Sequence, residues 1–340
     1  MTEGWLRGLN NSGSPKEPEV SVVVPAYNTA AHIAEALDSV FSQTFTGFEV
    51  IVVNDGSPDT NQLEKVLEPY RDRVVYLKQE NRGPSAARNA GIRSARGVFL
   101  AFLDSDDVWE REYLAAQMQF FRKDATLDLI YSDFLYSGDS EKAGKSYMNM
   151  YPPKGRVTFE NLMKREYLIF PTTTVVRKQV VVEAGLFDEE IPRSEDFDLF
   201  LRIAHRRGKI AYHRAALARR LIHPASLSFV GAKMLEAEDR VLRKLWDTLD
   251  LSPKQRRLLQ RRIDMPLAEK EGDRGKELLL LTDYAGARNC FAAAYRLRPT
   301  VKLWLVLFGL RIVPGPTRLL VRVWYHLLFG LKRFRMLGDL

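Results

Sequence analysis

The sequence of 340 residues predicts an α/β protein with a doubly wound, mainly parallel sheet, followed by a helical C-terminal extension. Two patterns support this fold class. Short valine-rich apolar runs recur about every 25 residues, the length of a strand plus a crossover helix. The stretches between these runs have the periodicity of amphipathic helices. Because strands that alternate with helices pair in parallel, we expect a sheet with helices on both faces.

The apolar runs are short and β-branched, which is typical of strands buried on both faces. The four predicted strands of the first half are residues 20–25, 48–53, 74–77 and 98–103, and residues 129–134 and 173–176 are two further candidates. Predicted helices are residues 30–43, 84–95 and 194–205. In the last of these, Ser194 is the expected cap and Glu195 and Asp196 fall in the first turn.

Composition divides the remaining chain. Residues 1–18 are polar and lack the apolar centre of a signal peptide, so we expect a flexible N-terminal arm. Residues 233–300 are predicted to be a helical extension and residues 301–340 a basic amphipathic tail. No apolar run reaches the roughly 20 residues that span a bilayer, and Cys290 is the single cysteine. These features favour a cytoplasmic protein without disulfides.

Polar residues follow the predicted strands where a doubly wound sheet binds its ligands. Pro25, Ala26 and Tyr27 follow the first strand, and the Asn-Asp-Gly-Ser sequence around Asp55 follows the second. That second sequence is also typical of an ordinary turn. The net charge of +8 indicates a phosphate-bearing partner, either a nucleotide, a nucleic acid or an anionic lipid.

The fourth strand is followed by Asp104, Ser105, Asp106 and Asp107. Three carboxylates within four positions repel one another unless a cation or a basic group neutralises them. Oxygen ligands suit a hard divalent cation, which often uses one or two carboxylates together with substrate phosphates. We therefore expect Mn²⁺ or Mg²⁺ at this strand end, against the alternative of solvated acids that end a strand.

Four segments, VSVVVPAYN, VIVVNDGSPD, NRGPSAARNAGI and FLAFLDSDD, together resemble the nucleotide-binding half of a family 2 glycosyltransferase with the GT-A fold. Their order and spacing both agree, and the later SEDFDLFLR is similar to the family's acidic motif. The resemblance covers about residues 20–230. It implies an inverting catalytic domain at residues 19–232, with a nucleotide-binding half at 19–127 and an acceptor half at 128–232.

The resemblance also implies roles for single residues. Asp55 would accept a hydrogen bond from the N3–H of uracil or thymine, or from the N1–H of guanine, and Pro25, Ala26 and Tyr27 would wall the base pocket. Arg88 would approach the nucleotide or its phosphates. Asp104 and Ser105 would lie at the ribose or metal region, and Asp106 would ligate the metal. His223 would complete the metal site, although a lone histidine is as often a packed or surface residue.

The acidic motif places Asp196 as the catalytic base that takes the proton from the acceptor hydroxyl. Its position in the first turn of a predicted helix favours its charged form. Glu195 would orient the acceptor or serve the helix cap. Many GT-A enzymes carry a glycine-rich acceptor loop before this motif, whereas here the sequence is Pro171-Thr172-Thr173-Thr174. The acceptor pocket is therefore the least defined part of the expectation.

We thus expect transfer of a sugar from a nucleotide-diphosphate donor, with UDP favoured, to a saccharide or lipid-linked acceptor in glycan biosynthesis. A nucleotidyltransferase is the competing enzyme class, but no Lys or Arg lies in the Ala26–Thr29 loop to bind a triphosphate. A nucleic-acid-binding protein is the non-enzymatic alternative, and the sequence lacks aromatic stacking residues on a predicted sheet.

The tail at residues 301–340 combines bulky apolar side chains with seven basic residues and one acidic residue, Asp339. Pro314 and Pro316 divide it into two short helical candidates. This composition suits helices that lie in a membrane interface with their basic side chains on anionic head groups. We expect peripheral attachment to the inner face of the cell membrane, against the alternative that the tail packs on the catalytic domain.

Overall fold

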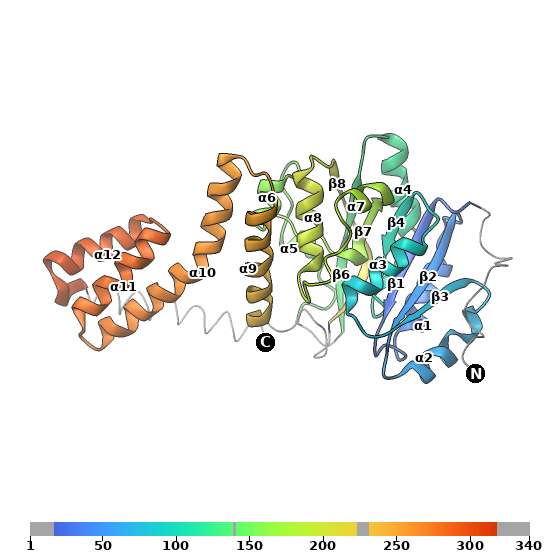
Figure 1. Ribbon diagram of the computed structural model, residues 1–340, viewed down its shortest axis with the longest axis horizontal. Helices are drawn as coiled ribbons and strands as arrows, with labels where there is room; N and C mark the ends of the chain where they lie inside the picture. Colours follow the sequence, from blue (N-terminus) through green and yellow to red (C-terminus); the bar gives the residue numbers. More distant parts are fainter. Residues whose placement is uncertain (1–16, 139–140, 223–230, 318–340) are drawn as a thin grey trace. The chain divides into compact units, whose positions relative to one another are not determined.

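The computed structural model describes residues 17–138, 141–222 and 231–317 (Figure 1). The chain divides into two compact units between Val241 and Leu242, a point that lies within α9. The first unit holds the sheet and the helices around it, and the second is helical. The predicted arm at residues 1–16 and the tail from residue 318 lie outside the described residues.

The first unit has an α/β architecture with one sheet and helices around it, which confirms the predicted fold class. Within the described residues the sheet has eight strands in the order β3-β2-β1-β4-β7-β6-β8-β5. The pairs β3–β2, β2–β1, β1–β4 and β6–β8 are parallel, whereas β4–β7, β7–β6 and β8–β5 are antiparallel. The strands are β1 Val20–Ala26, β2 Phe48–Asp55, β3 Val74–Gln79, β4 Phe99–Phe102, β5 Val108–Trp109, β6 Leu129–Gly138, β7 Thr174–Arg177 and β8 Ile210–Ile222.

Helices cover both faces of this sheet. On one face, Val20, Val22 and Val24 of β1 share a core with buried residues of α1, α2 and α4. On the other face α3 lies so close to β1 that a Cβ added at Gly91 would be 2.4 Å from Val23 Cγ1. The helices of this unit are α1 Ile33–Phe41, α2 Thr60–Leu67, η1 Glu68–Tyr70, α3 Pro84–Ser94, α4 Tyr113–Lys123, α5 Tyr147–Met150, α6 Phe159–Met163, η2 Pro171–Thr173, α7 Lys178–Glu183 and α8 Glu195–His205.

β1, β2 and β4 form where expected because their side chains are buried on both faces. Every residue of β1 except the partly buried Pro25 is buried. The strand β8 was not predicted. Its thirteen residues mix exposed arginines with apolar residues, so it shows neither a continuous apolar run nor a clear alternation.

The second unit is formed by helices, as the composition predicts. α9 Gly231–Thr248 begins in the first unit, and α10 Pro253–Leu280, α11 Tyr284–Leu297 and α12 Val301–Ile312 follow. Figure 1 shows α10, α11 and α12 packed successively, and Leu279, Phe291 and Leu310 form their shared core. Cys290 lies buried on α11. Among the described residues, no helix combines the length and the apolar character that crossing a bilayer requires.

Candidate active site

The first predicted site residues lie together at the carboxyl edge of the parallel strands. Pro25 and Ala26 end β1, with the half-exposed Tyr27 directly after them, and Ala26 pairs with Asn54 of β2. Asp55 is the last residue of β2. Asp104 and Ser105 follow β4, the other neighbour of β1. The topology therefore brings three segments that are far apart in the sequence to one edge.

Asp55 is buried, and its carboxylate organises the loop after β3. Oδ1 accepts hydrogen bonds from Gln79 Nε2 at 2.7 Å and from the backbone N–H of Arg82 at 2.9 Å. Oδ2 accepts from the Gly83 N–H at 2.8 Å. A carboxylate offers about four lone-pair sites. Three donors therefore leave Asp55 the capacity for one more, such as the N–H of a nucleotide base.

The loop between β1 and α1 is tied to both neighbouring strand ends. Asn28, which has a φ of 52°, donates its backbone N–H to Ser57 Oγ at 2.6 Å. The hydroxyl of Thr29 donates to the backbone oxygen of Ser105 at 3.4 Å. These contacts fix the positions of the segments that carry Tyr27, Asp55 and Asp104 relative to one another.

Arg88 of α3 contacts carboxylates from two segments that are far apart in the sequence. Its buried guanidinium donates through Nη2 to Asp104 Oδ1 at 2.7 Å and through Nη1 to Glu195 Oε1 at 2.8 Å. Burial opposes ionisation of Asp104, but the cation of Arg88 outweighs it and lowers the pKa of that carboxyl. One cation therefore connects the end of β4 to the start of α8.

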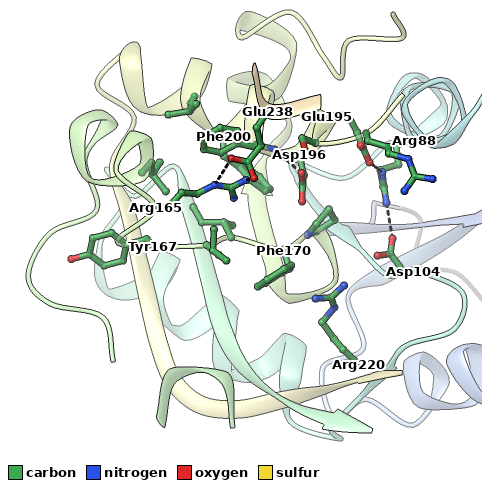
Figure 2. A pocket seen from close by; sticks show the side chains of 18 of the residues that line it. Arg88, Asp104, Arg165, Tyr167, Phe170, Glu195, Asp196, Phe200, Arg220 and Glu238 are labelled. Carbon is green, nitrogen blue, oxygen red and sulfur yellow. Dashed lines mark hydrogen bonds and ion pairs between the residues drawn. The ribbon is translucent and has the colours of Figure 1, made fainter. Parts of the chain in front are cut away.

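A pocket of about 420 Å³ lies beside this ion pair. Four sequence-predicted residues line it, namely Arg88, Asp104, Glu195 and Asp196. Figure 2 shows the Asp196 carboxyl group directed into it and the Arg220 guanidinium facing it from below. The other predicted residues, Pro25, Ala26, Tyr27, Asp55, Ser105 and Asp106, do not line this pocket, and His223 lies outside the described residues.

Asp196 sits at the start of α8, beside a residue in an unusual conformation. Ser194 precedes the helix as expected, but its φ is 61° and its side chain makes no capping hydrogen bond. Asp196 Oδ1 accepts from the backbone N–H of Phe197 at 2.7 Å, which leaves the second oxygen available. Burial raises the pKa of Asp196 above its ordinary value of 3.8, against the lowering effect of that N–H and of nearby arginines.

The structure adds Arg220, Asp107 and Thr172 to the site. Arg220 of β8 lines the pocket with its guanidinium carbon 4.3 Å from the centre of the Phe170 ring. Its Nε lies 3.5 Å from Asp107 Oδ2. The buried Asp107 also accepts from Thr172 Oγ1 at 2.7 Å and from the Leu221 N–H at 3.0 Å. Asp107 therefore connects the acidic loop to η2 and to β8.

The far wall of the pocket is mostly apolar and closed by one ion pair. Arg165 contacts Glu238 of α9, with its Nε 3.3 Å from Oε2, and its guanidinium lies over the Phe197 ring at 4.0 Å. No local sequence pattern predicts this pair, because its members are 73 residues apart. The apolar lining residues are Leu162, Tyr167, Leu168, Ile169, Phe170, Pro171, Pro192, Phe197, Phe200 and Leu201.

A pre-formed metal cage is absent from the part of the chain that the structure describes, where no three His, Cys, Asp or Glu residues gather closely enough to hold an ion. Asp104 and Asp106 are both partly exposed at the end of β4. Two such carboxylates match the one or two that a Mg²⁺ site uses when phosphates supply further oxygens.

Solved structures of other proteins share this fold. TarS 1–349 of S. aureus, solved in complex with UDP, matches with a TM-score of 0.56 and 22% identity over 88% of this chain and 89% of that one. The mannosyltransferase PcManGT of Pyrobaculum calidifontis, solved with GDP-Man and Mn²⁺, matches with a TM-score of 0.57 and 17% identity over 95% of this chain and 91% of that one. The fold is therefore that of GT-A glycosyltransferases.

Sequence comparison gives the family. Residues 21–183 match the model for glycosyl transferase family 2. An uncharacterized glycosyltransferase of Rickettsia prowazekii is 31% identical over 225 residues, which are 64% of this chain and 69% of that protein. One of Rickettsia felis is 29% identical over 68% of this chain and 38% of its own length, and the match to two further Rickettsia relatives spans 33% and 37% of theirs. With the motifs, the fold and these relatives in agreement, the chain belongs to glycosyltransferase family 2.

Proposed function

We propose that this chain is an inverting, metal-dependent glycosyltransferase that moves a sugar from a nucleotide-diphosphate donor to an acceptor hydroxyl. The observation that carries the proposal is the buried Arg88, which pairs with Asp104 on the donor side and with Glu195 next to Asp196. All four side chains line one pocket. The carboxylate proposed for the donor side and the candidate catalytic base therefore line the same pocket.

The proposed chemistry is a single displacement at the anomeric carbon of the donor sugar. The acceptor oxygen forms the new bond while the bond to the diphosphate breaks, and the configuration inverts. Asp196 takes the acceptor proton with the oxygen that Phe197 leaves available. Arg220, which faces Asp196 across the pocket, supplies positive charge for the anionic diphosphate. Glu195 holds Arg88 and supports the position of Asp196.

The acidic loop after β4 suits a divalent cation, either Mn²⁺ or Mg²⁺. Asp106 would hold it, with Asp104 beside it and His223 contributing from outside the described residues. When bound, such a cation would offset negative charge on the diphosphate. The solved complex of PcManGT with GDP-Man and Mn²⁺ supports this assignment by analogy of fold.

The donor is proposed to be a UDP-sugar. Asp55 retains capacity for one further hydrogen bond, which the N3–H of uracil would fill, and Pro25, Ala26 and Tyr27 stand beside it as walls of a base site. TarS, a structural neighbour, has been solved with UDP and with UDP-GlcNAc. The acceptor is proposed to be a saccharide or a lipid-linked saccharide. Action at the inner face of the membrane, with attachment through residues 301–340, would suit such an acceptor.

Replacement of Asp196 tests the proposal. Once a panel of UDP- and GDP-sugars has identified the donor, Asp196→Asn should lower turnover by about 10²–10⁴-fold, the usual contribution of a general base. Calorimetry should show that its affinity for UDP is unchanged, and NMR of the anomeric proton in the parental product should show inversion. Glu190→Gln, which removes an exposed carboxylate in the loop before α8, is the matched control and should keep full turnover. Near-parental turnover in Asp196→Asn would refute the assignment.

A further inference from the structure

The helix α12, Val301–Ile312, is apolar on two opposite faces. Its inner face packs into the core of the helical unit, where Leu310 is buried and Leu303, Val306 and Leu307 contact the same cluster. A helix that is apolar all round is normally buried on every side. The outer face of α12 therefore needs an explanation that packing within this unit does not give.

The outer face is formed by residues three or four positions apart, which lie on one side of a helix. It presents bulky side chains to solvent, and the rings of Trp304 and Phe308 are stacked with their centroids 5.3 Å apart. The exposed fractions are 77% for Val301, 49% for Trp304, 55% for Leu305, 51% for Phe308 and 58% for Ile312. A contiguous apolar face of this kind marks an interaction surface rather than scattered exposure.

Positive charge borders this outer face. At 3.6 residues per turn, Lys302 falls on one flank of the apolar stripe and Arg311 on the other. α12 contains no acidic residue. The sequence beyond it adds five basic residues, Arg318, Arg322, Lys332, Arg333 and Arg335, against Asp339 alone. A partner that covers this face must therefore be apolar at its centre and anionic at its border.

A second copy of the chain fits these requirements poorly. A helix of twelve residues is about 18 Å long and about 10 Å wide, whereas a stable dimer buries roughly 800 Å² on each partner. Two copies would also bring cationic borders together. A bilayer surface has neither problem, because its acyl chains receive the apolar stripe and its anionic head groups receive the flanking cations.

We propose that the outer face of α12 is a lipid-docking surface that inserts Trp304, Leu305, Phe308 and Ile312 into the interface of an anionic membrane. Lys302 and Arg311 then lie at the level of the lipid phosphates. This deepens the proposed attachment at the membrane and rests on that part of the proposed function. The proposal assigns membrane insertion to the outer face of α12.

Vesicle binding by the full chain tests the surface. Vesicles of phosphatidylcholine with about one third phosphatidylglycerol should bind the protein, and those without the anionic lipid should bind it far less. Leu305→Ser together with Phe308→Ser should raise the lipid concentration for half-binding by at least about tenfold, because two large apolar side chains are no longer inserted. Lipids with brominated acyl chains should quench the fluorescence of Trp304. The Trp304→Phe variant identifies that part of the signal, because it lacks this fluorophore.

The matched control is Leu267→Ser with Leu281→Ser, two exposed leucines of the same unit outside α12. This control should bind vesicles like the parent, and both variants should keep the parental circular dichroism and UDP affinity. Equal vesicle binding by the parent and by Leu305→Ser/Phe308→Ser would overturn the proposal. An absence of quenching would also overturn it. The same holds if the parent is a dimer that Leu305→Ser/Phe308→Ser dissociates and the control variant does not. Lost vesicle binding with turnover intact would leave the proposed reaction standing.

Discussion

At the scale of single residues, several charged side chains that line the pocket are held in ion pairs with one another. Arg88 serves Asp104 and Glu195, and Arg165 serves Glu238. Within the described part of the chain Asp196 has no ion pair of this closeness, and its pKa is raised chiefly by burial. Such a carboxylate is a stronger base than an exposed one, at a cost in stability.

That cost predicts how Asp196→Asn changes stability with pH. Because the pKa of Asp196 is higher in the folded protein than its ordinary 3.8, ionisation is less favourable in the folded state than in the unfolded state. The destabilisation is complete above the folded pKa and absent below about pH 4. Asp196→Asn should therefore unfold at a higher temperature than the parent at pH 7, with the difference disappearing towards pH 4.

Calorimetric melting of both proteins across this pH range measures the effect. Glu190→Gln provides the control, because it removes an exposed carboxylate from the loop before α8. A parental melting temperature for Asp196→Asn at pH 7 would mean that the carboxylate is not destabilised by burial.

At the scale of elements, the site depends on how closely α3 lies against β1. Gly91 is the point of approach, where α3 meets the side chain of Val23. The same helix carries Arg88, and its buried Asn89 exchanges hydrogen bonds with Phe187, donating to the backbone oxygen and accepting from the N–H. A shift of α3 away from the sheet would therefore move Arg88 away from Glu195 and Asn89 away from Phe187.

Gly91→Ala tests this dependence. An added methyl would meet Val23 Cγ1 at 2.4 Å, so the helix must shift or the side chain must leave its rotamer. We expect a loss of about 1–3 kcal/mol in the free energy of unfolding, measured with urea, together with weaker UDP binding. Gly272→Ala is the control, because a Cβ there meets nothing within 4 Å and helix propensity favours alanine. If Gly91→Ala and the parent are equally stable, then α3 packs less tightly against Val23 than the structure indicates.

The sequence predicted the first half of this fold well for a physical reason. β1, β2 and β4 are buried on both faces, so they appear as continuous valine-rich runs, and the doubly wound rule then locates Asp55 and Asp104. Arg220 and the Arg165–Glu238 pair could not be found in this way. β8 lacks a clear period, and contacts between residues far apart in the chain leave no local pattern.

At the scale of the whole molecule, the proposed donor site and the proposed lipid surface belong to different compact units. Nucleotide binding at the proposed site would stabilise only the unit that holds it, because a ligand shifts the folding equilibrium of the part that binds it. UDP with Mn²⁺ should therefore raise the melting temperature of the unit ending at Val241 and leave that of the helical unit unchanged.

Thermal melting with UDP, with Mn²⁺ and with both ligands measures this effect. Asp106→Ala should lose the part of the shift that requires Mn²⁺, measured from its own unliganded melting temperature. A parental shift in Asp106→Ala would remove this residue from the metal site, and equal shifts with and without Mn²⁺ in the parent would remove the metal from nucleotide binding.

The position of the sequence's one cysteine gives the helical unit a native chemical reporter. Cys290 is buried on α11 beside the core of that unit, and burial raises the pKa of its thiol. Alkylation therefore requires the thiol to become exposed, and a single mass increment marks each molecule in which this has happened. The rate of labelling counts openings of the helical unit alone. Comparing rates with and without vesicles would show, without any substitution, whether lipid contact restrains its breathing motions.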